Sequence, residues 1–177
     1  MAGHSKWKQI KHKKAATDGK RSQVFGKLAR LIAIESKKAG GIEDSPALRS
    51  VIERARAQNT PSEIIERAVQ KGRSDQGATL EAVTYEAYGP GGVALIIEGY
   101  TDNKNRTAAE IRHLLSKHGI ELAPPGAASW AFKKIMGGGF EAMSTVGLTE
   151  DDAVKLDALM ESLEGHDDVQ EVYTNAE

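Results

Sequence analysis

Cysteine is absent from the 177-residue sequence, and its absence excludes several classes of function. Without cysteine there is no disulfide framework, no thiolate nucleophile and no cysteine-based zinc site. No apolar run approaches the roughly 20 residues that a membrane-spanning helix needs. The N-terminus also lacks the apolar core of a secretory signal. We therefore expect a cytoplasmic protein without a membrane partner.

Acidic residues are scarce at the start of the chain, and basic residues are scarce at its end. Residues 1–38 hold 11 Lys+Arg and 2 Asp+Glu, a net charge of +9, whereas residues 39–140 hold 12 of each. Residues 141–177 hold 1 basic and 11 acidic residues, a net charge of −10. The total charge of −1 therefore hides a strong separation of charge. A polyanion would be attracted by the first segment and repelled by the last.

Three helices are predicted in the first half of the chain. Apolar residues recur at helical spacing from Val24 to Ile32, and Gly40-Gly41 ends this helix. Ser45-Pro46 predicts the start of a second helix, because serine caps helices well and proline fits their first position. Thr60 to Glu63 matches a capping box for the third helix. Gly72 suits a left-handed residue at the end of that helix.

After residue 78 the pattern changes to short strands that alternate with helices. The strand candidates are 83–88, 93–98, 120–122, 129–133, 141–146 and 169–174, and the helix candidates are 106–118 and 149–164. Two strand–helix–strand units predict a four-stranded antiparallel sheet with both helices on one face, the ferredoxin-like arrangement. The predicted fold class is α+β, with a basic three-helix domain at 1–78 and a ferredoxin-like α/β domain at 79–177.

The basic N-terminal segment is the candidate nucleic-acid-binding site. Its lysines and arginines can neutralise phosphates without reading bases. Trp7 and His12 offer stacking surfaces for unpaired bases. The alternative is a solvated tail, with Trp7 packed in the core. The candidate site residues are Lys6, Trp7, Lys8, Lys11, His12, Lys13, Lys14, Lys20, Arg21, Lys27 and Arg30.

The other motifs favour structural roles. Tyr88 to Gly92 lacks the spacing of a phosphate-binding loop and predicts a tight turn between strands. Thr101 to Thr107 lacks the alternation of a calcium loop, so we expect Asp102 or Asn105 to cap the following helix. Arg106 could meet an anion at that helix N-terminus. The five histidines show no metal-type spacing, and no catalytic triad or carboxylate pair stands out. We therefore expect no metal, no cofactor and no enzymatic activity.

Eight sequence blocks follow one another across nearly the whole chain. They are Met1–Trp7, Ile10–Ala15, Phe25–Leu28, Thr60–Gly72, Tyr85–Ala94, Thr101–Thr107, Ser129–Phe132 and His166–Asn175. In this order they resemble the YebC family, which includes PmpR-type regulators and a mitochondrial translational activator of cytochrome oxidase synthesis. Typical members have a helical domain and two α/β domains, one inserted within the other. Here the glycines at 137–139 stand where the inserted domain would be, so the resemblance implies that this domain is missing.

The resemblance implies a transcriptional regulator that binds DNA, and the basic helical domain would contact the phosphate backbone. A ribosome-associated translation factor that binds ribosomal RNA is the alternative, because lysine contacts the phosphates of DNA and RNA in the same way. A third alternative is a protein-interaction module that uses the acidic helix at 149–164.

Overall fold

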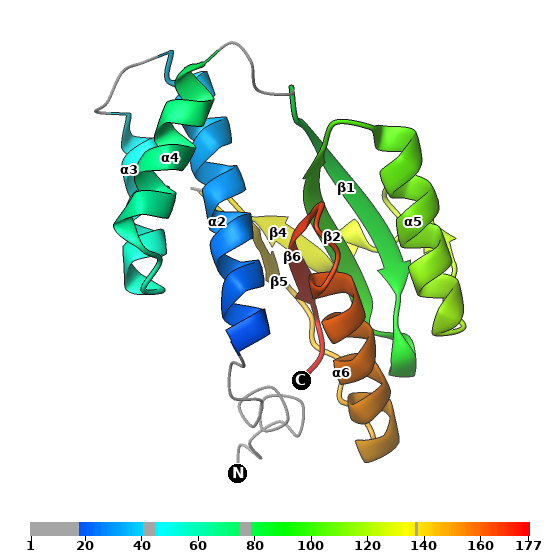
Figure 1. The fold of residues 1–177 in the computed structure, drawn as a ribbon. Coiled ribbons are helices and arrows are strands. Elements are labelled where there is room, and N and C mark those ends of the chain that lie inside the picture. The colour runs from blue at the N-terminus through cyan, green and yellow to red at the C-terminus, as the bar shows by residue number, and fades with distance from the viewer. Residues whose placement is uncertain (1–17, 41–44, 75–78, 137) are drawn as a thin grey trace. The chain divides into compact units, whose positions relative to one another are not determined.

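The computed structural model describes residues 18–40, 45–74, 79–136 and 138–177. These residues form two compact units, a helical unit up to Leu80 and an α/β unit from Glu81 to Glu177 (Figure 1). Among the described residues, no helix combines the length and the apolar character that crossing a membrane requires.

The helical unit contains α2 (Asp18–Lys38), α3 (Pro46–Ala57) and α4 (Ser62–Arg73), so the three predicted helices are confirmed. Ser45 occupies the N-cap of α3 and Pro46 its first position, as the sequence predicts. Apolar side chains from all three helices form one core. They are Leu28, Ile32, Leu48, Ala55, Ile65 and Ala68.

The predicted capping box at the start of α4 is wrong. The N-cap position belongs to Pro61, which has no side-chain cap, and the helix begins at Ser62. Thr60 N instead donates to Ala55 O at 3.0 Å, which holds Thr60 in the turn that ends α3. The buried Oγ1 of Thr60 has no hydrogen-bond partner among the described residues.

Gly72 also differs from its predicted role, because it lies inside α4 and not at a left-handed end. A Cβ added at Gly72 would lie 2.3 Å from Ala33 O of α2, which is closer than any real contact. Beside it, Ser36 Oγ donates to Val69 O at 2.9 Å. The glycine is therefore needed because α4 approaches the backbone of α2 at this point.

The α/β unit has a four-stranded sheet in the order β3-β1-β2-β6, in which each neighbouring pair is antiparallel. Its elements are β1 (Glu81–Tyr88), the 3-10 turn η1 (Pro90–Gly92), β2 (Ala94–Thr101), α5 (Lys104–Lys117), β3 (Leu122–Ala123), the 3-10 turn η2 (Ser129–Ala131), β4 (Phe132–Lys134), β5 (Phe140–Ala142), α6 (Glu150–Glu164) and β6 (Val169–Thr174). The predicted turn joins β1 to β2, and positive φ angles of 70° at Gly91 and 78° at Gly92 explain why glycine is needed there.

Both faces of the sheet are covered. Helices α5 and α6 lie on one face (Figure 1), where Ile111 and Leu159 pack with Leu95 and Ile97 of β2. On the opposite face, Ile96 packs with the buried residues of η2 and β4. The predicted α+β class, with N-terminal helices followed by a ferredoxin-like sheet, is confirmed.

One predicted strand pairs outside the main sheet. The region 141–146 was expected in the main sheet, but β5 pairs with β4 in a separate two-stranded sheet. Val146 forms only an isolated bridge with Ala176. The β1–β2 hairpin already fills the centre of the main sheet, while β3 and β6 take its two edges. The chain between β4 and α6 therefore covers the other face.

Candidate nucleic-acid interface

Seven predicted site residues lie outside the described residues: Lys6, Trp7, Lys8, Lys11, His12, Lys13 and Lys14. The remaining four, Lys20, Arg21, Lys27 and Arg30, lie on α2. The structure therefore positions only the second part of the predicted site.

Helix α2 brings three of these four residues together. At about 100° per residue, Lys20, Lys27 and Arg30 fall on one side of the helix, opposite the fully buried Ile32. All three are half-buried. Arg21 projects from a different side and is exposed.

The helical unit carries more positive charge than the predicted site residues alone. Residues 18–40 and 45–74 hold 12 Lys+Arg and 5 Asp+Glu, so their net charge is 12 − 5 = +7. Half of these cations lie on α3 and α4 and are exposed: Arg49, Arg54, Arg56, Arg67, Lys71 and Arg73. The charge count by sequence segment did not reveal these cations. Residues 39–140 include both α3 and α4 and most of the sheet, and their basic and acidic residues are equal in number.

Charge along α4 is not distributed as in a typical base-reading helix. Such a helix enters the major groove with its N-terminal residues against the bases. The first five residues of α4 include the exposed Glu63 and Glu66, whereas Arg67, Lys71 and Arg73 follow toward its C-terminus. Carboxylates at that end would face the phosphates on either side of the groove. The helical unit is therefore suited to contact phosphates and not to read bases through the start of α4.

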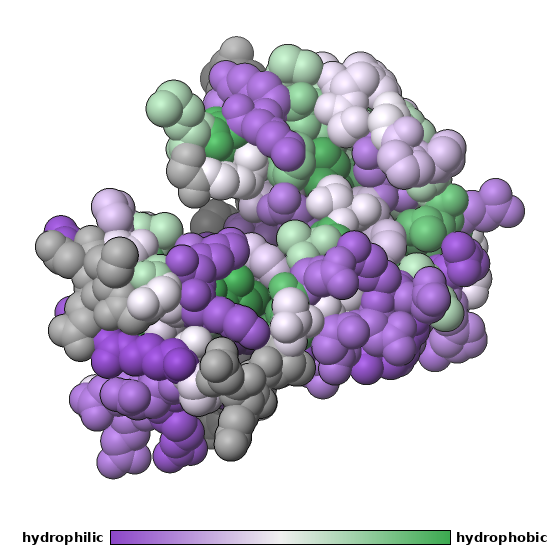
Figure 2. All heavy atoms as spheres, turned by 90° about the horizontal axis from the view of Figure 1, so that it is seen from above, coloured by the Kyte–Doolittle hydropathy of each residue, from purple (hydrophilic) through white to green (hydrophobic). Residues whose placement is uncertain are grey.

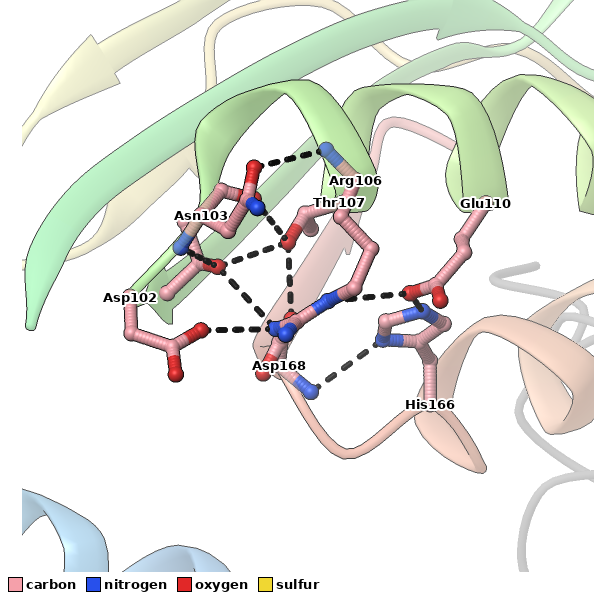
Figure 3. Close-up of polar contacts among 8 residues, drawn as sticks. Asp102, Asn103, Arg106, Thr107, Glu110, His166 and Asp168 are labelled. Atoms are coloured by element: carbon pink, nitrogen blue, oxygen red, sulfur yellow. Dashed lines mark hydrogen bonds and ion pairs between the residues drawn. The ribbon is translucent and has the colours of Figure 1, made fainter.

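In the α/β unit, the predicted Thr101–Thr107 motif forms a polar network around Asp168 (Figure 3). Asp168 Oδ2 accepts from Thr107 Oγ1 at 2.7 Å and from Arg106 Nη2 at 3.0 Å. The hydroxyl groups of Thr101 and Thr107 are also hydrogen-bonded, at 2.7 Å. Arg106 Nη2 donates as well to Asp102 Oδ1 at 2.9 Å. Hydrogen bonding to Asp168 raises the pKa of Arg106, so the guanidinium stays charged.

The cap of α5 differs from the two predicted candidates. Asn103 is the N-cap, and its Oδ1 accepts from Arg106 N at 3.0 Å. Neither Asp102 nor Asn105 has this role. Arg106 forms ion pairs with three carboxylates, those of Asp102, Glu110 and Asp168. It therefore neutralises charge within the chain, although the sequence suggested that it could meet an external anion.

The same network brings a histidine and two carboxylates together, although the sequence spacing did not predict it. Ligand atoms of Glu110, His166 and Asp168 lie within 4.8 Å of one another. However, Asp168 N donates to His166 Nδ1 at 3.1 Å, so in the neutral ring the proton is on Nε2, directed at Glu110 Oε2 3.0 Å away. Arg106 occupies Asp168 Oδ2. These donors and acceptors satisfy one another, so the cluster does not fit a divalent cation.

Glu86 is a second buried carboxylate, and it organises the loop before β4. Its Oε1 accepts from Gly126 N at 2.8 Å, and its Oε2 accepts from Ala128 N at 2.7 Å and from Ser129 N at 2.9 Å. Burial would raise the pKa of Glu86, but these backbone hydrogen bonds outweigh burial and lower it. The ionised form therefore holds this loop against β1.

A groove of about 640 Å3 lies beside the C-terminal end of α5. Its lining residues include His118 and Asp152. His118 Nε2 lies 3.0 Å from Ser162 Oγ. The Ser162 hydroxyl donates to Ala158 O at 3.0 Å, so it accepts from His118. This direction is opposite to that of a histidine that activates a serine nucleophile.

Family models match nearly the whole chain. The TACO1/YebC protein N-terminal domain matches residues 5–75, and the TACO1/YebC second and third domain matches residues 80–137 and 136–176. The last two stretches meet at residues 136–137, in the connection between β4 and β5. The loss of an inserted domain at this place stays a prediction.

Relatives agree with this assignment over the full chain. A probable transcriptional regulatory protein of Thermosipho africanus is 39% identical over 237 residues, which cover 100% of this chain and 94% of the relative. One of Dictyoglomus turgidum is 45% identical over 100% of this chain and 72% of the relative. The crystal structure of the conserved hypothetical protein Aq1575 from Aquifex aeolicus is 32% identical, with a TM-score of 0.81 over 98% of this chain and 97% of that one. The chain therefore belongs to the TACO1/YebC family.

Proposed function

We propose that this protein is a cytoplasmic transcriptional regulator that binds DNA through its basic helical unit, and that it is not an enzyme. The observation that carries the proposal is the difference in charge between the two units. The described helices hold a net charge of +7, whereas residues 81–177 hold 7 Lys+Arg and 17 Asp+Glu, a net charge of −10. The name that the Thermosipho and Dictyoglomus relatives carry supports the regulatory role.

The main binding energy would come from phosphate contacts. Lysine and arginine release counterions from the nucleic acid when they neutralise phosphates, and this term does not depend on sequence. Exposed arginines on α3 and α4 add to the cations of α2. Sequence preference would then come from the shape and deformability of the duplex.

A ribosome-associated translation factor that binds ribosomal RNA is the second candidate. The carboxylates in the first half of α4, Glu63 and Glu66, favour it, because they oppose insertion of that end into a major groove. Cations on three separate helices also suit the irregular phosphate surface of a folded RNA.

Quantitative binding at several salt concentrations tests the main proposal. The full chain is titrated with a promoter duplex from its own genome, a random duplex of equal length and a structured ribosomal RNA fragment. Contact with about six phosphates gives a log–log salt slope near −5. A regulator prefers the promoter duplex at moderate salt. Equal affinity for both duplexes at every salt concentration contradicts the regulator.

Sedimentation of gently lysed cells separates the two candidates. A translation factor travels with ribosomes and is released by RNase but not by DNase. A regulator stays off ribosomes and is recovered with chromosomal DNA.

A further inference from the structure

The hairpin of β4 and β5 carries large apolar side chains that the described α/β unit leaves exposed. The exposed fraction is 61% for Trp130, 61% for Met143, 45% for Ile135 and 104% for Met136. Met143 N donates to Ala131 O at 2.8 Å, which places Met143 beside the turn that bears Trp130. We name these four residues the hairpin patch. Most of the surface seen in Figure 2 is hydrophilic, and exposed apolar surface is confined to limited areas. Tryptophan is highly buried on average, so a grouping of this kind marks an interaction surface.

The indole of Trp130 is held in place although it is exposed. Its Nε1–H donates to Tyr88 Oη at 2.8 Å, and the Tyr88 hydroxyl donates to Ala127 O. The polar atom of the indole is thus satisfied within the chain. What remains exposed is apolar ring surface, which gains free energy only by packing against another surface.

Opposite charges lie between the two apolar ends of the hairpin. Lys133 of β4 lies opposite Glu141 of β5, and Lys133 Nζ is 2.9 Å from Glu141 Oε2. Both side chains are more than half exposed. Side chains alternate along a strand, so this pair points away from Phe132 and Phe140, which pack toward the main sheet. The face is apolar and electrically neutral, a composition that suits a protein partner and not a polyanion.

The Lys133–Glu141 pair on one hairpin is complementary in charge to the same pair on a second copy. When two such hairpins meet about a two-fold axis, each lysine can lie beside the glutamate of the other copy, while the apolar side chains pack together. The family match places a discontinuity at this hairpin. Its two stretches meet at residues 136–137, so additional family residues would belong at the tip of this hairpin. The match with the Thermosipho africanus relative spans 237 residues, whereas this chain has 177.

We propose that the hairpin patch is an interface with a second copy of this chain. In the dimer, Lys133 lies beside the partner's Glu141, and Trp130 and Met143 of the two copies pack around the axis. This proposal does not depend on the target of the helical unit.

Analytical ultracentrifugation of the full chain over a wide range of concentrations tests the proposal. The wild type shows a reversible monomer–dimer equilibrium, and Met143→Lys weakens it about tenfold or more, because it places a charge in an apolar contact. Val154→Lys is the matched control, since Val154 is 57% exposed on α6, outside the patch. Thermal unfolding verifies that both variants fold. A wild type that is monomeric at every concentration overturns the proposal, and so does a dimer that Met143→Lys leaves unchanged.

A charge exchange tests the geometry of the interface. Lys133→Glu gives each patch two negative charges and Glu141→Lys gives each patch two positive charges, so each variant alone dimerises less than the wild type. An equimolar mixture restores dimers, because the two faces then attract one another. Failure of the mixture to dimerise better than either variant alone contradicts the two-fold arrangement.

Fluorescence then locates the contact. With Trp7→Phe, the emission reports Trp130 alone, because the chain has two tryptophans. The emission shifts to shorter wavelength as the dimer forms, since the indole leaves water. Dimer formation without this shift places the interface elsewhere and overturns the proposal.

Discussion

Arg106 and Asp168 join the start of α5 to the segment before β6 through a bond of 3.0 Å between Nη2 and Oδ2. The Asp168 side chain is 6% exposed, and Arg106 is 45% exposed. Tyr100 N also donates to the backbone oxygen of Asp168, at 2.9 Å. One aspartate therefore connects β2, α5 and β6. The sequence motif from Thr101 to Thr107 is explained by this structural role.

Removal of the Asp168 carboxylate is the first prediction. Asp168→Ala leaves Thr107 and Arg106 without their common acceptor, and we expect the free energy of unfolding to fall by about 1–3 kcal/mol. Urea unfolding followed by circular dichroism measures the loss. Asp102→Ala is the control, because Asp102 contacts the same arginine from an exposed position and its loss costs less. Equal losses for the two variants contradict the central role of Asp168.

The second prediction concerns acid stability and Glu86. The pKa of Glu86 is lower in the folded protein than its usual value of 4.5, so ionisation of this carboxylate stabilises the fold. That contribution is complete above the unfolded-state pKa and is lost as the pH falls through the folded-state pKa. Glu86→Gln lacks it at every pH, so the wild type exceeds the variant most near neutral pH and the difference shrinks in acid. Urea unfolding across a pH series measures this difference, and a difference that stays constant into acid would falsify the assignment.

Sequence patterns predicted the elements with regular spacing. Apolar residues at helical spacing predicted α2, and the glycines after Tyr88 predicted the β1–β2 turn. Both predictions succeed because these structures depend mainly on residues that are close in sequence. Thr60 and Gly72 were misassigned since their roles depend on contacts with α3 and α2 that no local pattern contains. Asn103 was missed as a cap for a smaller reason: several capping residues stand side by side, and only the backbone path selects one.

The candidate site was predicted only in part. Lysine density in residues 1–38 indicated a phosphate-binding segment, but it did not reveal the arginines of α3 and α4. Counting charge by predicted helix would have found them, since residues 45–74 hold 6 Lys+Arg and 3 Glu. The exposure of Trp130 could not be predicted, because tryptophan is more often buried and the β4–β5 hairpin was not expected.

Glycine substitutions give the third prediction. Alanine normally stabilises a helix interior relative to glycine by about 0.5–1 kcal/mol. Gly26→Ala in α2 should show this gain, because nothing lies within 4 Å of the added Cβ. Gly72→Ala should instead destabilise the protein by about 1–3 kcal/mol, since its Cβ would collide with Ala33 O. Thermal unfolding of both variants measures the two signs. A gain at both positions would show that α4 can move away from α2 without cost.

The fourth prediction tests the arginines of α3. Arg54→Glu combined with Arg56→Glu should weaken DNA binding about tenfold or more and reduce the magnitude of the salt slope by about 2, one for each lost phosphate contact. Arg112→Glu combined with Lys117→Glu changes the net charge equally on exposed positions of α5 and serves as the control. The control should bind nearly as the wild type does. If both double variants lose the same affinity, net charge alone governs binding and α3 is not part of the interface.

The fifth prediction concerns the N-terminal lysines, which lie outside the described residues. Lys11→Glu, Lys13→Glu and Lys14→Glu together should abolish nucleic-acid binding, because three attractive contacts become repulsive at one place on the phosphate backbone. The fold should be unaffected, and the thermal unfolding midpoint should match that of the wild type. Unchanged binding would remove these residues from the site and leave the exposed arginines as its centre. Loss of binding in this variant and in the α3 variant would show that the N-terminal lysines and the α3 arginines both contribute to binding.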